Sequence, residues 1–410
     1  MAIKLSNRIK LVKPSPTLAL SAKAKEMRAA GIDVVNFGVG EPDFNTPEYI
    51  KAAAHAAIDA NFTHYTMNAG IPELRQAICD KYSRCNHLDY DPKQILVSPG
   101  AKASIVNVLI ALCDHQDQVL IPVPYWVSYP YQAMLANAEP VYIPTTQDHD
   151  FKITAKSLTE AIRQNPCSKA LLINNPNNPT GAVYSRKELE AIAEICLEHS
   201  ILVIADEIYE RLVYDGVKHV SIAEISPEMK EQTVIVNGVS KAYAMTGWRL
   251  GYAAGPAHII AAAARVQEHA TSCVNSITQK ACVTALTEED ESIENMRAEF
   301  QKRRDFLYSK LCGLPHIDCF KPQGAFYISP NIDWYLNQGL KGITTSAEFC
   351  QMLLEKHHVA LVPGDCFGMG SIVRFSYANS MENLQKGVAR FEAFLKELIS
   401  KGEEHDRLSG

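Results

Sequence analysis

Short, uninterrupted apolar runs alternate with helical patterns along the middle of the chain. The runs occupy residues 119–121, 170–173, 201–205, 233–236 and 250–254. Runs without polar alternation are typical of strands buried on both faces of a mostly parallel sheet. Between them, Ser185 and Glu188 form a capping-box pattern, and Thr46-Pro47 predicts another helix start because proline suits the first turn. This alternation predicts an α/β fold with one main sheet.

The pattern changes near residue 300. A charged helical segment around 299–310 is followed by short apolar runs at 325–328, 360–362 and 372–375. These predict a smaller α+β domain, which the N-terminal segment is expected to join. We therefore expect residues 1–48 to form an arm and part of the small domain, 49–300 a large domain, and 301–410 the rest of the small domain.

Composition narrows the class of protein. A chain of 410 residues suggests two or three units of roughly 150 residues each. With 47% hydrophobic residues and a net charge of −6, it lacks the basic balance of nucleic-acid-binding proteins. The eleven cysteines form no C-x-x-C pair and predict reduced thiols. No signal peptide or membrane-spanning run is evident. We expect a cytoplasmic protein with no membrane or nucleic-acid partner and no metal.

Polar residues follow several of the predicted strands. Asn174 to Gly181 follow one run, Asp206 to Tyr209 the next, and Lys241 lies just beyond a third. Arg374 lies within a later apolar run. Because ligands in open α/β sheets bind outside the carboxyl ends of the strands, we expect these side chains to converge on one rim.

Each of these residues has an ordinary and a functional interpretation. Lys241 could be an ordinary solvated lysine, or it could form an imine with an aldehyde. Arg249, eight residues later, favours the second interpretation because a guanidinium is suited to bind a phosphate. Asp206 could cap a helix, or face a ring nitrogen and keep it protonated. Tyr209 could be a core residue or reach a cofactor oxygen. Asn178 could belong to a simple turn or donate to a developing oxyanion.

The segment 238–251 resembles the lysine signature of class I pyridoxal-phosphate-dependent aminotransferases. Further blocks resemble that family in the same order along the chain: 38–43, 65–72, 124–129, 175–181, 206–209 and 374–377. The resemblance spans about residues 14 to 395 and is nearest to the bacterial and plastid type of aspartate aminotransferase, including bifunctional aspartate/prephenate enzymes. It implies the type I pyridoxal-phosphate fold and a homodimer with active sites at the subunit interface.

The resemblance also implies roles for individual residues. Toward pyridoxal 5'-phosphate, Lys241 would be the Schiff-base lysine and proton shuttle, and Asp206 would pair with the pyridinium nitrogen. Tyr209 and Asn178 would hydrogen-bond the phenolic oxygen, and Trp126 would stack on the ring. The phosphate would be held by Arg249 with Gly100, Ala101 and Lys102, and Tyr65 would reach the phosphate of the neighbouring subunit. Toward the substrate, Arg374 would bind the α-carboxylate, helped by the backbone of Gly40, and Trp126 and Asn178 would also contact the substrate. Lys102 or Lys13 would bind the distal carboxylate.

Two departures from the family pattern affect these expectations. Some relatives carry a hydroxyl residue three places before the lysine, where this chain has Gly238. Some also bind the distal carboxylate with an arginine from the partner subunit, but the stretch 271–278 contains none. Lys102 is the expected substitute, although it could simply be a lysine at a helix start.

The implied activity is transfer of an amino group from aspartate or glutamate to a 2-oxo acid by a ping-pong mechanism. Candidate acceptors are 2-oxoglutarate, oxaloacetate and prephenate. Alternatives on the same fold are an aromatic- or alanine-type aminotransferase and a carbon–sulfur lyase. A non-enzymatic regulator would need a DNA-binding module, for which no residues remain.

Overall fold

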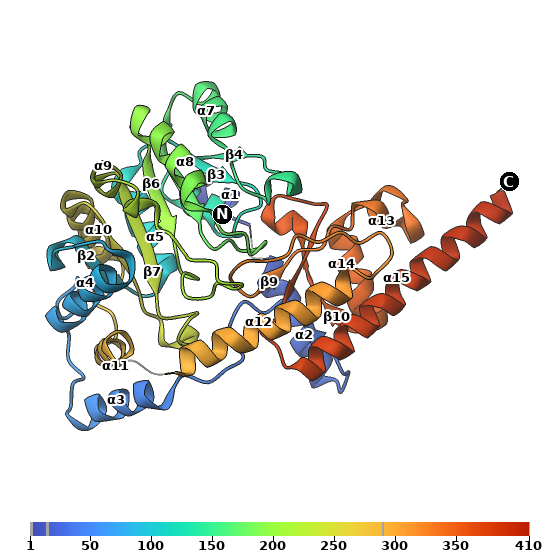
Figure 1. The fold of residues 1–410 in the computed structure, drawn as a ribbon, viewed down its shortest axis with the longest axis horizontal. Helices are drawn as coiled ribbons and strands as arrows, with labels where there is room; N and C mark the ends of the chain where they lie inside the picture. The colour runs from blue at the N-terminus through green and yellow to red at the C-terminus, as the bar shows by residue number, and fades with distance from the viewer. Residues whose placement is uncertain (1–2, 14–15, 289–290, 410) are drawn as a thin grey trace.

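A seven-stranded sheet forms the centre of the protein, shown here as a computed structural model that describes residues 3–13, 16–288 and 291–409 (Figure 1). Its strands are β2 (Ile95–Ser98), β3 (Gln118–Pro122), β4 (Glu139–Ile143), β5 (Ser168–Asn174), β6 (Leu202–Asp206), β7 (Thr233–Gly238) and β8 (Gly251–Ala254). They lie in the order β2-β8-β7-β6-β5-β3-β4, and β8 is antiparallel to both its neighbours while the other pairs are parallel. The expectation of a mostly parallel α/β sheet is therefore confirmed.

Helices cover both faces of this sheet because successive strand residues alternate between two apolar layers. Val119 and Ile121 belong to the core under α5 (Ala101–Leu112), α6 (Tyr129–Leu135) and α10 (Ala257–Ala270). Leu120 belongs to the opposite core under α7 (Ala155–Gln164) and α8 (Arg186–Glu198). That second face continues under α4 (Pro72–Asn86) and α11 (Ser276–Thr287). Burial on both sides explains why the strand sequences lack polar alternation.

The two predicted helix starts are confirmed to within a residue. Ser185 caps α8 and forms the predicted capping box with Glu188. The helix predicted at Thr46-Pro47 is α3 (Glu48–Asp59), with Pro47 at the cap rather than in the first turn. The sequence patterns did not predict β2 or β4. The latter is an edge strand in which only Ile143 is fully buried.

A second group of elements lies beside the sheet. It holds the pair β1 (Val35–Asn36) and β10 (Val359–Ala360), the sheet β11 (Val362–Pro363), β12 (Val373–Ser376) and β9 (Tyr327–Ile328), and the helices α13 (Asp333–Asn337), α14 (Ser346–His357) and α15 (Met381–Ser409). Because β1 pairs in parallel with β10, the N-terminal segment joins the C-terminal part of the chain. The expected boundary at 300/301 falls inside one continuous helix, α12 (Ser292–Leu311).

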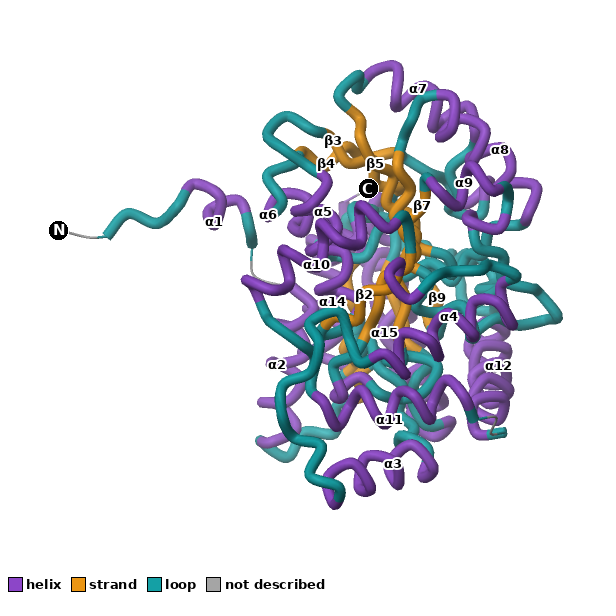
Figure 2. Tube along the Cα trace, turned by 90° about the vertical axis from the view of Figure 1, so that its left-hand side faces the viewer, coloured by secondary structure: helices purple, strands orange, loops and turns teal. Residues whose placement is uncertain are grey.

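The chain begins with an arm whose N-terminal end projects from the molecule, while its helix α1 (Asn7–Leu11) lies against α6 (Figure 2). α2 (Pro16–Ala29) follows, and α9 (Pro227–Glu231) lies between β6 and β7 in the sequence. Among the described residues, no helix is both long and apolar enough to cross a membrane.

Candidate active site

A cavity of about 470 Å³ lies where the carboxyl ends of β5, β6 and β7 meet β12 and the loop after β1. The sequence-predicted residues that line it are Gly40, Ala101, Lys102, Trp126, Asn178, Asp206, Tyr209, Lys241, Arg249 and Arg374. Gly100 borders it beside Arg249. Tyr65, with 93% of its surface exposed, and Lys13, also exposed, do not line the cavity within this chain.

Lys241 lies three residues beyond the end of β7, and its side chain enters the cavity. Its Nζ donates a hydrogen bond to the Gly40 carbonyl oxygen at 2.6 Å. Burial lowers the pKa of Lys241 to about 8, despite the opposing influence of Glu41. A substantial share of this amine is therefore neutral near physiological pH, as a nucleophile or proton acceptor requires.

Asp206 ends β6 and places a buried carboxylate in the same cavity. Its Oδ2 accepts a hydrogen bond from the Tyr129 hydroxyl at 2.6 Å, and its Oδ1 accepts one from the Ile208 backbone N–H at 3.2 Å. Burial raises the pKa of Asp206 to about 6, although both hydrogen bonds favour the anion. Such a carboxylate gains stability from a cationic partner in the cavity.

Asn174 joins the ends of β5 and β6. Its side-chain amide donates to the Asp206 carbonyl oxygen at 2.9 Å, and its side-chain oxygen accepts from the Asn178 backbone N–H at 2.7 Å. Tyr209, one turn beyond Asp206, has its hydroxyl 3.0 Å from the Tyr327 hydroxyl. The cavity wall thus presents Asn178 and Tyr209 on a framework of hydrogen bonds.

Arg374 reaches the cavity from β12 and is buried. It donates to the Asn178 side-chain oxygen at 3.0 Å and to the Gly38 carbonyl oxygen at 2.9 Å. Its guanidinium also lies 4.4 Å from the Tyr327 ring centre. In the described part of the chain, Arg374 has no carboxylate partner, and its Nε atom is buried without a hydrogen bond. A buried guanidinium in this state is suited to bind a carboxylate ligand.

The N-terminus of α5 and Arg249 form an anion-binding corner. Gly100 caps the helix with φ +91°, and a Cβ atom added there would lie 2.5 Å from Arg249 Nη2. Gly251 is also tightly packed, since a Cβ atom added there would lie 2.1 Å from the Ala101 backbone nitrogen. Free N–H groups at a helix start, next to a guanidinium, bind phosphate groups well.

Close packing against the neighbouring strand explains why residue 238 is a glycine. A Cβ atom there would lie 2.9 Å from Gly251 Cα, in the neighbouring strand β8. A hydroxyl residue would not fit at that position. Ser240, two residues later, lines the cavity and offers a hydroxyl in its place.

Two lysines approach the cavity from different elements. Lys102 Nζ lies 4.7 Å from the centre of the Trp126 ring, and burial together with Arg249 lowers the pKa of Lys102. Lys25, on α2, lines the cavity as well and was missed from the sequence. Tyr129 and Tyr327 were also missed. Tyr129 lies in a block that resembles the family, but the contacts of both tyrosines depend on tertiary packing.

This fold and this site define an α/β enzyme in which a lysine, a buried carboxylate and two guanidinium groups share one cavity. Comparison with known proteins places the chain among the aminotransferases. The family model described as "Aminotransferase class I and II" matches residues 32–391, so the chain belongs to that family.

Individual relatives agree with this assignment. The chain is 48% identical over 394 residues to an aspartate aminotransferase of Geobacillus stearothermophilus, covering 96% of this chain and 99% of the relative. It is 44% identical over 394 residues to an aspartate/prephenate aminotransferase of Cereibacter sphaeroides, covering 95% and 98%. A solved structure of Thermus thermophilus aspartate aminotransferase with maleate superposes with a TM-score of 0.90 at 40% identity, covering 96% of this chain and all of the other.

Proposed function

We propose that the protein is a pyridoxal-phosphate-dependent aspartate aminotransferase that exchanges an amino group between a dicarboxylic amino acid and a 2-oxo acid. One observation carries the proposal. A lysine with a lowered pKa, a buried carboxylate and a buried guanidinium without a carboxylate partner among the described residues line one cavity. The relatives named aspartate aminotransferase and aspartate/prephenate aminotransferase support the substrate class.

The residues present fit pyridoxal 5'-phosphate. The α5 N-terminus at Gly100 and Ala101, together with Arg249, would hold its phosphate, where the missing Cβ of Gly100 leaves room for the guanidinium. Asp206 would pair with its ring nitrogen, because a buried carboxylate with a raised pKa favours a cationic partner. When bound, the cofactor supplies an electron sink for the substrate's α-carbon. Trp126 would pack on the ring, and Tyr209 and Asn178 would donate to its phenolic oxygen.

Lys241 would carry two functions in succession. Its neutral amine would hold the cofactor, and once the substrate amine has taken that place, the freed Lys241 amine would act as the base toward the proton on the substrate's α-carbon. The lowered pKa of Lys241 suits both steps. Since each half-reaction releases one product before the next substrate binds, the kinetics would be ping-pong.

Arg374 would bind the substrate α-carboxylate, helped by the backbone of Gly40. Lys102 would bind the distal carboxylate, with Lys13 as a second candidate cation. A lysine is a mobile point charge and tolerates carboxylates at different distances, which suits aspartate, glutamate and prephenate alike. The acceptors would be 2-oxoglutarate, oxaloacetate and prephenate.

We also infer a cytoplasmic homodimer. Tyr65, with 93% of its surface exposed, would reach the phosphate in the partner subunit. The site would lie between a large cofactor-binding domain, 49–300, and a small domain built from 1–48 and 301–410, in keeping with the pairing of β1 and β10.

The decisive experiment combines an assay with chemical trapping. Purified protein loaded with pyridoxal phosphate should transfer the amino group of aspartate to 2-oxoglutarate. Borohydride reduction should fix the cofactor on the peptide that contains Lys241, as mass spectrometry would show. Absence of amino transfer from every dicarboxylic donor, or fixation at another lysine, would refute the proposal.

A further inference from the structure

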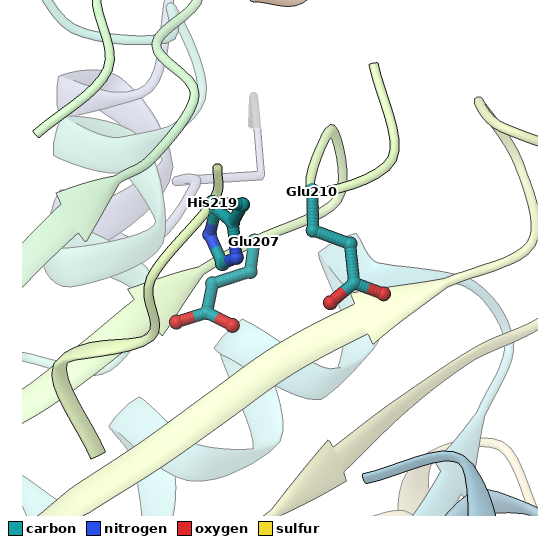
Figure 3. Close-up of side chains that lie close together, drawn as sticks. All are labelled: Glu207, Glu210 and His219. Atoms are coloured by element: carbon teal, nitrogen blue, oxygen red, sulfur yellow. The ribbon is translucent and has the colours of Figure 1, made fainter. Parts of the chain in front are cut away.

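A second cluster of titratable side chains surrounds the turn that carries Asp206 and Tyr209. Glu207, Glu210 and His219 converge there, with ligand-type atoms all within 4.8 Å of one another (Figure 3). None of the three lines the catalytic cavity. The residues at 206 and 209 therefore face the cavity, whereas those at 207 and 210 point into this cluster.

Each member of the cluster is tied to a different segment. Glu207 Oε1 accepts a hydrogen bond from the Ser221 hydroxyl at 2.6 Å. Glu210 accepts one from Lys81 Nζ, on α4, at 2.7 Å. His219 Nε2 donates to the Asn175 carbonyl oxygen at 3.1 Å, since a carbonyl can only accept. Together these contacts tie the turn to α4, to the loop around Ser221, and to the chain that follows β5.

Two carboxyl groups and an imidazole are a common ligand set for a divalent cation. Here, however, Lys81 already forms an ion pair with Glu210. Lys81 is buried, and its ammonium lies 2.5 Å from Glu210 Oε1 as well as 2.7 Å from Oε2. It thus supplies the positive charge that a metal ion would bring. A second cation at Glu210 would have to overcome repulsion from Lys81 in a poorly screened environment.

Burial shifts the pKa of each of the other two members of the cluster. Burial raises the pKa of Glu207 well above its ordinary value, and burial lowers the pKa of His219 to about 4. Burial also opposes ionisation of Glu210, but Lys81 and Arg211 contribute to lowering the pKa of that carboxyl overall. The other titratable groups that interact electrostatically with these residues are Tyr82, Tyr90, Arg211, Glu224, Tyr243 and Tyr252. The result is one ion pair flanked by an acid whose protonated form is favoured by burial and an imidazole whose neutral form is favoured by burial.

We propose that this cluster is a positioning device: the hydrogen bond from Ser221 to Glu207 and the Glu210–Lys81 pair fasten the two ends of the turn that presents Asp206 and Tyr209 to the cavity. His219 completes it through Asn175, whose backbone N–H donates to the Asp206 carbonyl oxygen at 3.0 Å. Misplacement of a reacting group by about 1 Å can cost roughly a hundredfold in rate, so a turn held from behind serves the chemistry without touching it.

The test compares two substitutions at Glu207, with Glu190→Leu on the exposed face of α8 as the matched control. This inference rests on the proposed function for its kinetic readout. With aspartate as donor, Glu207→Leu should lower kcat by roughly a hundredfold and change KM less than about twofold, because Arg374 is held separately by Asn178 and Gly38. Glu207→Gln should recover most of that loss, since its amide oxygen can accept the same hydrogen bond from Ser221.

A second readout does not depend on catalysis. Amide hydrogen exchange in residues 206–210 should speed up in the Leu variant and stay near the parent rate in the Gln variant. If the parent enzyme transfers no amino group, the proposed function fails, and the exchange data still decide this inference. Should the Leu variant not fold, His219→Gln, which weakens the tie at Asn175, replaces it in both measurements.

Three results would overturn the proposal. A Gln variant as impaired as the Leu variant would mean that the hydrogen bond from Ser221 does not hold the turn. A Leu variant with the parent's kcat and exchange rates would mean that the turn needs no support. A rise in melting temperature with Mn²⁺ or Zn²⁺ in the parent, absent in His219→Gln, would make the cluster a metal site.

Discussion

Replacing Lys102 by methionine tests whether the enzyme selects dicarboxylic substrates. Methionine keeps the length and apolar stem of the side chain, including its contact with Trp126, and removes the charge. Lys102 Nζ lies 4.7 Å from the Trp126 ring centre, in the cavity that Arg374 also lines. A substrate held by Arg374 at one carboxylate therefore has a cation within the same cavity for the other.

The magnitude depends on how strongly solvent screens Lys102. At about 4 Å, an ion pair is worth about 1 kcal/mol in water and about 4 kcal/mol near a protein surface. Lys102 is exposed overall, yet burial of part of its side chain lowers its pKa, so its surroundings lie between these limits. A charge-assisted hydrogen bond of about 1.5–3 kcal/mol corresponds to roughly ten- to a hundredfold in kcat/KM.

The assay measures kcat/KM for aspartate, glutamate, alanine and phenylalanine with the parent, Lys102→Met and Lys25→Met. Lys25→Met is the matched control, because Lys25 lines the same cavity from α2. We expect Lys102→Met to lose the stated factor on aspartate and glutamate and much less on the other two donors. An equal loss on all four would assign Lys102 to the phosphate or the fold. A selective loss in Lys25→Met alone would move the distal carboxylate to Lys25.

Four further predictions follow from the site. In cofactor-free protein, the rate at which Lys241 captures pyridoxal phosphate should rise roughly tenfold per pH unit up to about pH 8 and then level off. The reason is that the amine is neutral above its pKa of about 8. Stopped-flow absorbance would measure this rate. Asp206→Asn should retain the cofactor but lose roughly a hundredfold in kcat, the scale of one preorganised electrostatic contact, in steady-state assays. Tyr129→Phe should cost about tenfold in kcat, since Asp206 loses a 2.6 Å hydrogen bond. Gly100→Ala should weaken cofactor binding in equilibrium titrations and lower the free energy of unfolding by about 1–3 kcal/mol, because φ is +91° and the new Cβ would meet Arg249.

Controls separate these effects from general damage. Gly216→Ala carries a similar backbone strain, with φ +73° and open space around the Cβ, and should leave cofactor affinity unchanged. Equal cofactor losses in Gly100→Ala and Gly216→Ala would contradict the role of the Arg249 contact. A capture rate independent of pH, or parent-like turnover in Asp206→Asn or Tyr129→Phe, would count against the corresponding residue.

Much of this protein could be inferred from the order of its residues. Continuous apolar runs identified β3, β5, β6, β7 and β8, because a strand buried on both faces must be apolar at every position. Polar residues directly after those runs identified Asp206 and Lys241, since the ends of parallel strands meet at one edge of a sheet. The spacing of these residues within blocks resembling the family supplied the rest of the predicted site.

Tertiary structure decided what depends on distant segments meeting. The hydroxyl of Tyr129 reaches Asp206 across 77 residues of sequence, and Arg374 reaches Asn178 across 196. No local pattern records such contacts, because they arise from the packing of α6 and β12 against the sheet ends. The same holds for the raised pKa of Glu207: its sequence position is that of an ordinary acidic residue, and burial raises the pKa of its carboxyl. Sequence fixes which chemical groups are available, whereas packing sets their distances and dielectric surroundings, and these determine pKa and role.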